Sequence, residues 1–306
     1  MGFNRFDFHP LINAGVRAAD YIKPTPIQQQ TIPLLLQGHD IMGLAQTGTG
    51  KTAAFVLPIL HRLLQTGNRR RTRALVIAPT RELAEQIHEA IRNLGKQTGL
   101  KSVTVYGGVG FNPQVEKLKR GAEIVVACPG RLLDHIGERT INLSEVEMLV
   151  LDEADHMFDM GFLPDIRKIL KHLPQKRQTM LFSATMPQEI RHLANDTLNN
   201  PVTIQVDVTA PALTVSHAIY PVAQHLKTPL LIQLLRHTDA DSVLIFTRTK
   251  HRAKKVGEQL VKSGYRAASL QGNLSQAKRQ AAMNGFRNGT FQILVATDIA
   301  ARGIDV

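Results

Sequence analysis

The stretch Ala45-Gln46-Thr47-Gly48-Thr49-Gly50-Lys51-Thr52 decides the fold, because it joins an apolar run, Ile41–Leu44, to a helical pattern that opens at Ala53. Glycines in such a loop let successive backbone N–H groups turn toward phosphate oxygens at the positive end of a helix. Lys51 is then placed to reach the outer phosphates, and Thr52 can ligate Mg²⁺. Ala45 stands where the plain form of this loop has a glycine. The stretch predicts a strand, a phosphate-binding loop and a helix.

A second apolar run, Met148–Leu151, leads directly into Asp152-Glu153-Ala154-Asp155. Ligands of parallel sheets bind at the carboxyl ends of the strands, which is where these acids would lie. Asp152 is positioned to hold Mg²⁺, and Glu153 to orient and deprotonate the water that attacks a γ-phosphate. The acids could instead be a solvated helix start. Together with the phosphate-binding loop, however, they predict a site for nucleotide hydrolysis.

Short β-branched runs alternate with helical patterns along the rest of the chain, and a helix is predicted at 81–95 between two of them. Strands that are apolar on both faces predict a parallel sheet covered by helices on both sides. Residues 207–216 carry little charge and one proline, which predicts an extended linker. We therefore expect two α/β domains, 1–206 and 217–306. The predicted strands are 74–78, 103–106, 124–127, 148–151, 179–182, 202–206, 243–247, 266–270 and 293–297.

The composition of the 306 residues is that of a folded globular protein, with 43% apolar and 20% charged residues. This excludes a disordered chain, a collagen-like repeat and a coiled coil. The single cysteine, Cys128, cannot form an internal disulfide, and Met1–Pro10 has no apolar signal core. No run of about 18 apolar residues that could span a membrane occurs. A reducing, cytoplasmic setting without a membrane is predicted.

The net charge of +12 is typical of a protein that binds a polyanion or of one kept soluble by its charge. Residues 217–306 carry 13 basic and 5 acidic residues, so this part is the more basic per residue. We interpret the run Arg69-Arg70-Arg71-Thr72-Arg73 as a solvated loop. The twelve histidines show no metal-ligand spacing, and His156 is interpreted as a packing or surface residue.

Further short motifs follow one another along the chain in a definite order. In content and order the sequence resembles the DEAD-box RNA helicases of superfamily 2, and among them the bacterial RhlE type. The resemblance covers nearly the whole chain and implies two tandem RecA-like domains. The motifs are Pro24-Thr25-Pro26-Ile27-Gln28, the loop at 45–52, Pro79-Thr80-Arg81-Glu82-Leu83, Gly107-Gly108, Pro129-Gly130-Arg131, Asp152–Asp155, Ser183-Ala184-Thr185, Phe246-Thr247-Arg248, Gln276-x-x-Arg279, Ala296-Thr297-Asp298 and Ala301-Arg302-Gly303-Ile304-Asp305.

The resemblance implies that ATP is the nucleotide. A side-chain amide offers both a donor and an acceptor, so Gln28 can read the edge of adenine. By resemblance Tyr21 stacks on the base and the backbone around Lys23 lies beside it. Phe3 supports this corner or is only a core anchor of the N-terminal segment. Asp20 departs from the family's glycine, which bears on the local turn.

Two other pairs of residues have roles implied by the family. Ser183 and Thr185 follow a predicted strand and can link the Asp152–Asp155 carboxylates to adjoining elements through their hydroxyls, or cap a helix. By resemblance Asp305 approaches the ribose hydroxyls of ATP, and Arg302 reaches across to the first domain.

RNA contacts are expected mainly at the sugar-phosphate backbone, so sequence specificity should be low. Cys128 stands where the family has a threonine, whose hydroxyl caps the following helix better than a thiol does. The residues implied by resemblance are Thr80, Arg81, Gly107, Gly108, Pro129, Gly130 and Arg131 in the first domain, and Arg248, Gln271, Gly272 and Thr297 in the second.

The resemblance implies an ATP-dependent RNA helicase that hydrolyses ATP and separates short duplexes, with RNA and ATP or ADP as partners. An ATP-gated RNA clamp or assembly factor is the alternative, and a DNA translocase a more distant one. The sequence names no partner in ribosome assembly or RNA degradation. Since the chain stops at Val306, we expect an incomplete second domain that binds nucleotide but unwinds weakly or not at all.

Overall fold

The computed structural model describes residues 2–46, 48–66, 71–206, 216–238 and 240–297. The chain divides into two compact units, one on each side of residues 207–215. In the described ranges, no helix is both long enough and apolar enough to cross a membrane.

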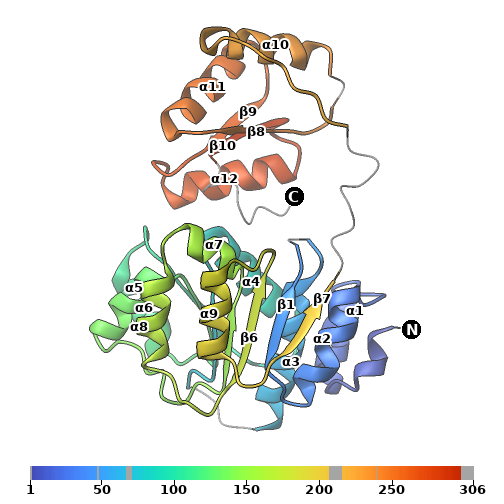
Figure 1. Ribbon diagram of the computed structural model, residues 1–306, viewed down its shortest axis with the longest axis vertical. Coiled ribbons are helices and arrows are strands. Elements are labelled where there is room, and N and C mark those ends of the chain that lie inside the picture. The colour runs from blue at the N-terminus through green and yellow to red at the C-terminus, as the bar shows by residue number, and fades with distance from the viewer. Residues whose placement is uncertain (1, 47, 67–70, 207–215, 239, 298–306) are drawn as a thin grey trace. The chain divides into compact units, whose positions relative to one another are not determined.

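The first unit is built on a parallel sheet of seven strands (Figure 1). Its order is β3-β4-β2-β5-β6-β1-β7, and every neighbouring pair runs in the same direction. The predicted parallel α/β sheet is thereby confirmed. The strands are β1 (Ile41–Leu44), β2 (Ala74–Ile77), β3 (Ser102–Val105), β4 (Ile124–Ala127), β5 (Met148–Leu151), β6 (Gln178–Ser183) and β7 (Val202–Gln205).

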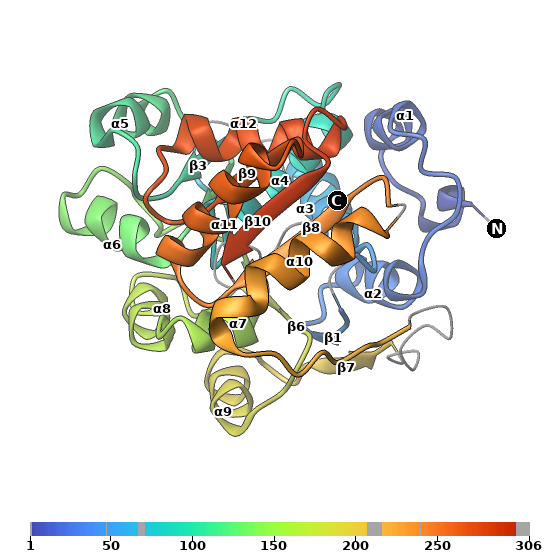
Figure 2. The same ribbon diagram turned by 90° about the horizontal axis from the view of Figure 1, so that it is seen from above.

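Both faces of this sheet are buried under helices, which Figure 2 shows from above. Ala74 and Val76 of β2 pack into the core with α1 to α4, whereas Leu75 and Ile77 pack into the core with α6 to α9. Alternate residues of one strand therefore fill two cores, as its continuous apolar run requires. The helices are η1 (Phe3–Phe6), α1 (Pro10–Ala18), α2 (Pro26–Leu36), α3 (Lys51–Gln65), α4 (Arg81–Leu94), α5 (Phe111–Lys119), α6 (Pro129–Gly137), α7 (Ala154–Asp159), α8 (Leu163–Leu170) and α9 (Gln188–Thr197).

The interpretation of the basic run before β2 as a solvated loop is wrong at Arg73. The Arg73 side chain is only 2% exposed, and its Nε lies 2.7 Å from Oε1 of Glu147. Its Nη1 also donates to the carbonyl of Leu63. A buried guanidinium is tolerated because a carboxylate and hydrogen bonds satisfy it. Arg71 is exposed and pairs with Glu145.

The second unit contains a smaller parallel sheet in the order β8-β10-β9. Val256 and Leu260 of α11 pack on one face of it, and Met283 and Phe286 of α12 on the other. β9 is thus an edge strand within the described residues. The elements are η2 (Gln224–Leu226), α10 (Lys227–Arg236), β8 (Val243–Thr247), α11 (Lys250–Lys262), β9 (Ala267–Leu270), α12 (Gln276–Arg287) and β10 (Ile293–Thr297).

Candidate nucleotide and RNA site

The strand order of the first unit brings three predicted motifs together. The strands β5, β6 and β1 are adjacent and parallel, and each leads at its carboxyl end into one motif. The acids 152–155 follow β5, Ser183 ends β6 and leads to Thr185, and the loop 45–50 follows β1. Motifs that are far apart in sequence therefore meet at one edge of the sheet, where such sheets bind ligands.

The phosphate-binding loop is held by hydrogen bonds to its own backbone. The Lys51 side chain is only 6% exposed, and its Nζ donates to the carbonyl of Ala45 at 2.9 Å. Thr49 Oγ1 donates to the carbonyl of Gln46 at 2.7 Å. Gly50 has φ +90°, a conformation that favours glycine, and a Cβ there would also lie 2.6 Å from Nε2 of Gln28.

The two carboxylates after β5 are buried beside Lys51. Burial raises the pKa of Asp152 to about 6, although the Lys51 charge lowers it, and the charge of Glu153 adds to the rise. Glu153 is also buried and lies in the left-handed region, with φ 52° and ψ 54°, immediately before α7. A non-glycine residue in this region costs conformational free energy, and such strain clusters at functional sites.

The hydrogen bonds expected from the hydroxyls after β6 are present and converge on Asp155. Thr185 donates to Oδ2 of Asp155 through both its backbone N–H and its Oγ1, each at 2.9 Å. Ser183 Oγ accepts from the Asp155 backbone N–H at 3.1 Å and donates to the Thr185 carbonyl at 2.7 Å. These bonds tie the end of β6 to the start of α7.

His156 is a neighbour of Glu153 that the sequence did not assign to the site. It is buried, as expected of a packing residue, but its Nδ1 lies 3.3 Å from Oε2 of Glu153. Its Nε2 is buried without a hydrogen-bond partner in the described chain. Nδ1 therefore carries the proton that Glu153 accepts, and the imidazole holds the carboxylate from the side of α7.

The corner expected to hold adenine is assembled around Gln28 and Tyr21. The Gln28 amide makes two hydrogen bonds, because its Oε1 accepts from the Thr25 N–H at 2.9 Å and its Nε2 donates to the Gly50 carbonyl at 3.0 Å. The second N–H of Nε2 and the second lone pair of Oε1 are the positions left for reading a base. Tyr21 is 38% exposed, and its ring packs edge-on against the buried ring of Phe3 at 5.8 Å. Phe3 is thus a core residue that also supports Tyr21.

The turn that leads into Tyr21 has a conformation that glycine adopts more easily than Asp20 does. Asp20 has φ +55°, in the left-handed region, and its N–H donates to the Arg17 carbonyl at 3.1 Å. The turn is therefore formed, but by a residue that adopts this conformation at a cost. Lys23, two residues beyond Tyr21, is exposed.

The RNA-binding candidates of the first unit follow three other adjacent strands, β3, β4 and β2. The guanidinium of Arg81 lies directly over Gly108, where an added Cβ would be 2.1 Å from its Nη1. Gly108 also has φ +78°, a left-handed conformation that favours glycine. Arg131 Nη1 donates to the carbonyl of Val109 at 3.1 Å. Two arginines therefore meet the glycine turn at the same sheet edge.

The remaining candidates surround this turn. Thr80 Oγ1 accepts from the Leu83 N–H at 3.2 Å and caps α4. Gly107 is half-buried, Pro129 is buried at the start of α6, and Gly130 is exposed beside it. Cys128 occupies the N-cap of α6 without a side-chain hydrogen bond, and burial raises the pKa of its thiol to about 12. The thiol is thus neutral and does not cap the helix.

The candidates of the second unit also follow the carboxyl ends of their strands. Arg248 is exposed after β8, and Thr297 is half-buried at the end of β10. After β9, Gln271 is buried with its Oε1 accepting from the Asn273 N–H at 2.7 Å, while Gly272 is exposed. Thr47, Arg302 and Asp305 lie outside the described residues.

The donor set beside Lys51 fits Mg²⁺. Asp152 and Thr52 offer a carboxylate and a hydroxyl oxygen, the kind of ligand that Mg²⁺ takes. No group of three His, Cys, Asp or Glu side chains that could hold a metal ion occurs within the described ranges. Mg²⁺ is usually bound through one or two protein oxygens plus substrate phosphates and water.

A glycine-rich loop after β1, buried acids after β5 and linking hydroxyls after β6 form the arrangement typical of P-loop nucleotide-binding domains with a parallel α/β core. A model of the DEAD/DEAH box helicase family matches residues 25–193, and a model of the helicase conserved C-terminal domain matches residues 226–306. The chain belongs to the DEAD-box helicase family.

Individual relatives agree with this family. The ATP-dependent RNA helicase DeaD of Buchnera aphidicola is 44% identical over 99% of this chain and 50% of its own length. The ATP-dependent RNA helicase CshA of Listeria monocytogenes is 43% identical over 99% of this chain and 58% of its own. The chain thus spans about half the length of the curated relatives it matches. The narrower RhlE type stays a prediction.

Solved structures show the same fold. A variant of Dbp5 from S. cerevisiae bound to RNA and ADP-BeF3 has a TM-score of 0.86 and 30% identity, covering all of this chain and 78% of that one. A DEAD-box protein from Methanococcus jannaschii has a TM-score of 0.65 and 36% identity, covering all of this chain and 82% of that one. Both units are therefore RecA-like.

Proposed function

We propose that the protein hydrolyses ATP in response to RNA and uses the cycle to separate short RNA duplexes locally. The observation that carries the proposal is the buried group of Lys51, Asp152 and Glu153, joined through Asp155 to Thr185 at the edge shared by β5, β6 and β1. The identity with DeaD and CshA, both named ATP-dependent RNA helicases, supports it. A reducing, cytoplasmic setting is part of the proposal.

Each side chain has a defined task in this reaction. The Lys51 ammonium leaves the Ala45 carbonyl and pairs with the outer phosphates, where it offsets negative charge. Asp152 and Thr52 would hold Mg²⁺, which supplies charge neutralisation at the phosphates when bound. Glu153 accepts a proton from the attacking water, and His156 holds its carboxylate in place. Thr185 and Ser183 fix Asp155 and so the start of α7.

The roles of Lys51 and Glu153 separate binding from turnover. Lys51→Ala should weaken nucleotide binding, because Lys51 contacts phosphate in the ground state. Glu153→Gln should preserve binding and abolish turnover, because Glu153 acts on the attacking water. Both are measured by fluorescent-nucleotide titration and by ATPase assay with single-stranded RNA. Hydrolysis by Glu153→Gln at the unmodified rate would show that another group is the base.

Base selectivity tests the assignment of Gln28. Adenine and guanine present opposite hydrogen-bond polarity at the six-position, so an amide that reads adenine should favour ADP over GDP. Gln28→Ala should reduce that preference, with the loss measured against both nucleotides by calorimetry. Equal affinities of the unmodified chain for ADP and GDP would show that Gln28 serves only to hold Thr25 and Gly50.

Strand separation distinguishes a helicase from a clamp. A helicase releases the labelled strand of a short RNA duplex only with hydrolysable ATP, whereas a clamp retains RNA with ATP and releases none. RNA affinity should fall steeply with salt but change little between unrelated sequences of equal length, because phosphates carry the contact. A strong preference for one sequence would contradict backbone recognition.

A further inference from the structure

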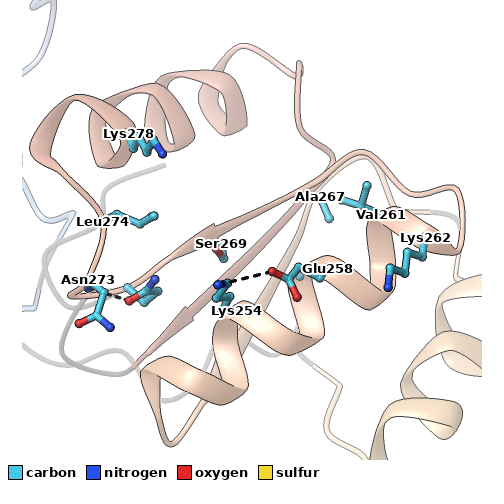
Figure 3. Close-up of a pocket in the computed structure, with 11 residues that line it drawn as sticks. Lys254, Glu258, Val261, Lys262, Ala267, Ser269, Asn273, Leu274 and Lys278 are labelled. Atoms are coloured by element: carbon cyan, nitrogen blue, oxygen red, sulfur yellow. Dashed lines mark hydrogen bonds and ion pairs between the residues drawn. The ribbon is translucent and has the colours of Figure 1, made fainter.

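A groove of about 590 Å³ lies along the outer edge of β9 in the second unit (Figure 3). It is bounded by β9, by one stripe of α11 and by the loop that leads into α12. Lys254 and Lys262 lie outside the motifs quoted for the family, and Lys278 is an unspecified position within Gln276-x-x-Arg279. The lining residues are Lys254, Gly257, Glu258, Val261, Lys262, Ala267, Ser269, Gln271, Asn273, Leu274 and Lys278.

The groove has a regular construction. On α11 the lining positions are spaced three and four residues apart, which places them on one face of the helix. On β9 they are Ala267 and Ser269, two residues apart and so on one face of the strand. Gly257 keeps the helix close to the strand, because an added Cβ would be 3.3 Å from Cβ of Ser269. Helix and strand therefore form two continuous walls.

The charge of the groove is positive. Lys254, Lys262 and Lys278 contribute three cations against the single carboxylate of Glu258. Glu258 lies 3.9 Å from Lys254, and both side chains are mostly exposed, so that pair is weak. Within the described residues neither Lys262 nor Lys278 forms an ion pair. The groove therefore complements an anion.

The spacing of the lysines fits a chain of phosphates better than a single one. Lys254 and Lys262 are eight residues apart on α11, which separates them by about 12 Å along the helix axis. No aromatic side chain lines the groove among the described residues, so stacking of bases has no platform there. Recognition would go through phosphates alone.

One end of the groove adjoins the expected RNA contact of this unit. Figure 3 shows Asn273 and Leu274 at that end and Lys262 and Ala267 at the other. Gln271 lines the groove and precedes the exposed Gly272, and Lys250 Nζ donates to Oδ1 of Asn273 at 3.1 Å. A strand bound at Gln271 and Gly272 would enter the groove directly.

We propose that this groove guides single-stranded RNA away from the carboxyl edge of the second sheet, with Lys254, Lys262 and Lys278 contacting phosphates spaced along the strand. This rests on the proposed RNA-dependent function and extends its RNA site beyond the motif residues. The groove lengthens the bound strand without adding sequence preference, because lysine is a flexible point charge that reads no base.

The test compares two neighbouring lysines of α11 in the full chain. Lys254 lines the groove, whereas Lys255 is exposed on the same helix and does not. Affinity for labelled oligouridylates of increasing length is measured by fluorescence anisotropy over a range of salt concentrations, and thermal unfolding checks the fold of each variant. Lys262→Ala serves as a second groove variant.

Each groove variant should reduce the magnitude of the slope of log K against log salt concentration by about 0.7. The loss of RNA affinity caused by removing one lysine should therefore be about fivefold larger at 0.1 M salt than at 1 M salt. The effect should appear only above a threshold RNA length. Lys255→Ala should leave both slope and affinity unchanged.

Equal RNA affinities for Lys254→Ala and Lys255→Ala would overturn the proposal and leave the lysines as charges that shield the edge of β9. Binding of a glutamate-rich peptide that depends on Lys254, with RNA affinity unaffected, would also overturn it and assign the groove to an acidic protein segment. If the unmodified chain bound no RNA, the groove and the proposed function would fall together, whereas the first two outcomes leave that function intact.

Discussion

Replacing Asp152 by asparagine is expected to stabilise the nucleotide-free protein at neutral pH while abolishing ATP hydrolysis. Burial raises the pKa of this carboxyl to about 6 from a reference value of 3.8. The native state therefore binds the proton more tightly than the unfolded chain does. The contribution of this carboxyl to stability falls as the pH rises from about 4 to about 6 and is constant above that, because the charged form is the costly one.

The size of the effect follows from the shift. About two pKa units correspond to about 3 kcal/mol of differential interaction above pH 6. Asparagine keeps the oxygen that accepts from the Glu153 N–H at 3.0 Å but brings an amide nitrogen that needs a partner. We therefore expect a gain of about 1–3 kcal/mol at pH 8 and almost none near pH 4. For a unit of this size, 1 kcal/mol moves Tm by roughly 2–4 °C.

The measurement is urea unfolding followed by far-ultraviolet circular dichroism at several pH values, since the chain has no tryptophan. Asp155→Asn is the matched control. Asp155 accepts two hydrogen bonds from Thr185, so its replacement should destabilise the protein at every pH. A gain for Asp152→Asn that is equal at pH 5 and pH 8, or a loss at pH 8, would refute the reasoning.

Three further substitutions test local features of the first unit. Asp20→Gly should raise stability by about 0.5–1 kcal/mol, seen as a higher Tm, because glycine adopts φ +55° without strain; an unchanged or lower Tm would contradict this. Cys128→Thr should add about 1 kcal/mol by capping α6, and calorimetry showing no gain would mean that the hydroxyl finds no N–H. His156→Leu should lower kcat about tenfold with KM for ATP unchanged, whereas His156→Asn, which retains a donor, should keep most of the rate. Equal losses in both His156 variants would assign the residue to packing alone.

Most strands of the fold could be predicted from the sequence because they are buried on both faces. The runs 124–127, 148–151, 243–247 and 293–297 match observed strands residue for residue. A strand inside a parallel sheet needs an uninterrupted apolar run, and that signal is local. The order of the strands is not local, so the side-by-side placement of β5, β6 and β1 required the structure.

The parts of the site that could not be predicted depend on backbone conformation. His156 is three residues from Glu153, a spacing that indicates contact in a helix, but Glu153 lies before α7 in a left-handed conformation that no pattern announces. Arg73 lies in a run of arginines and looks solvated. Its burial follows from its ion pair with Glu147. Glu147 lies seventy-four residues later, just before β5, and reaches Arg73 only in the folded sheet.

The loop that binds phosphate has a consequence for the energetics of ATP binding. In the structure the Ala45 carbonyl takes the Lys51 ammonium and the Gly50 carbonyl takes the Gln28 amide, so the protein occupies its own recognition groups. Where a nucleotide takes over these same bonds, its measured affinity is that of an exchange reaction, reduced by the share of molecules in the self-bonded form. The carbonyl groups of the loop thus act as intramolecular competitors of the nucleotide for Lys51 and Gln28. The loop keeps the buried Lys51 cation hydrogen-bonded when no nucleotide is bound.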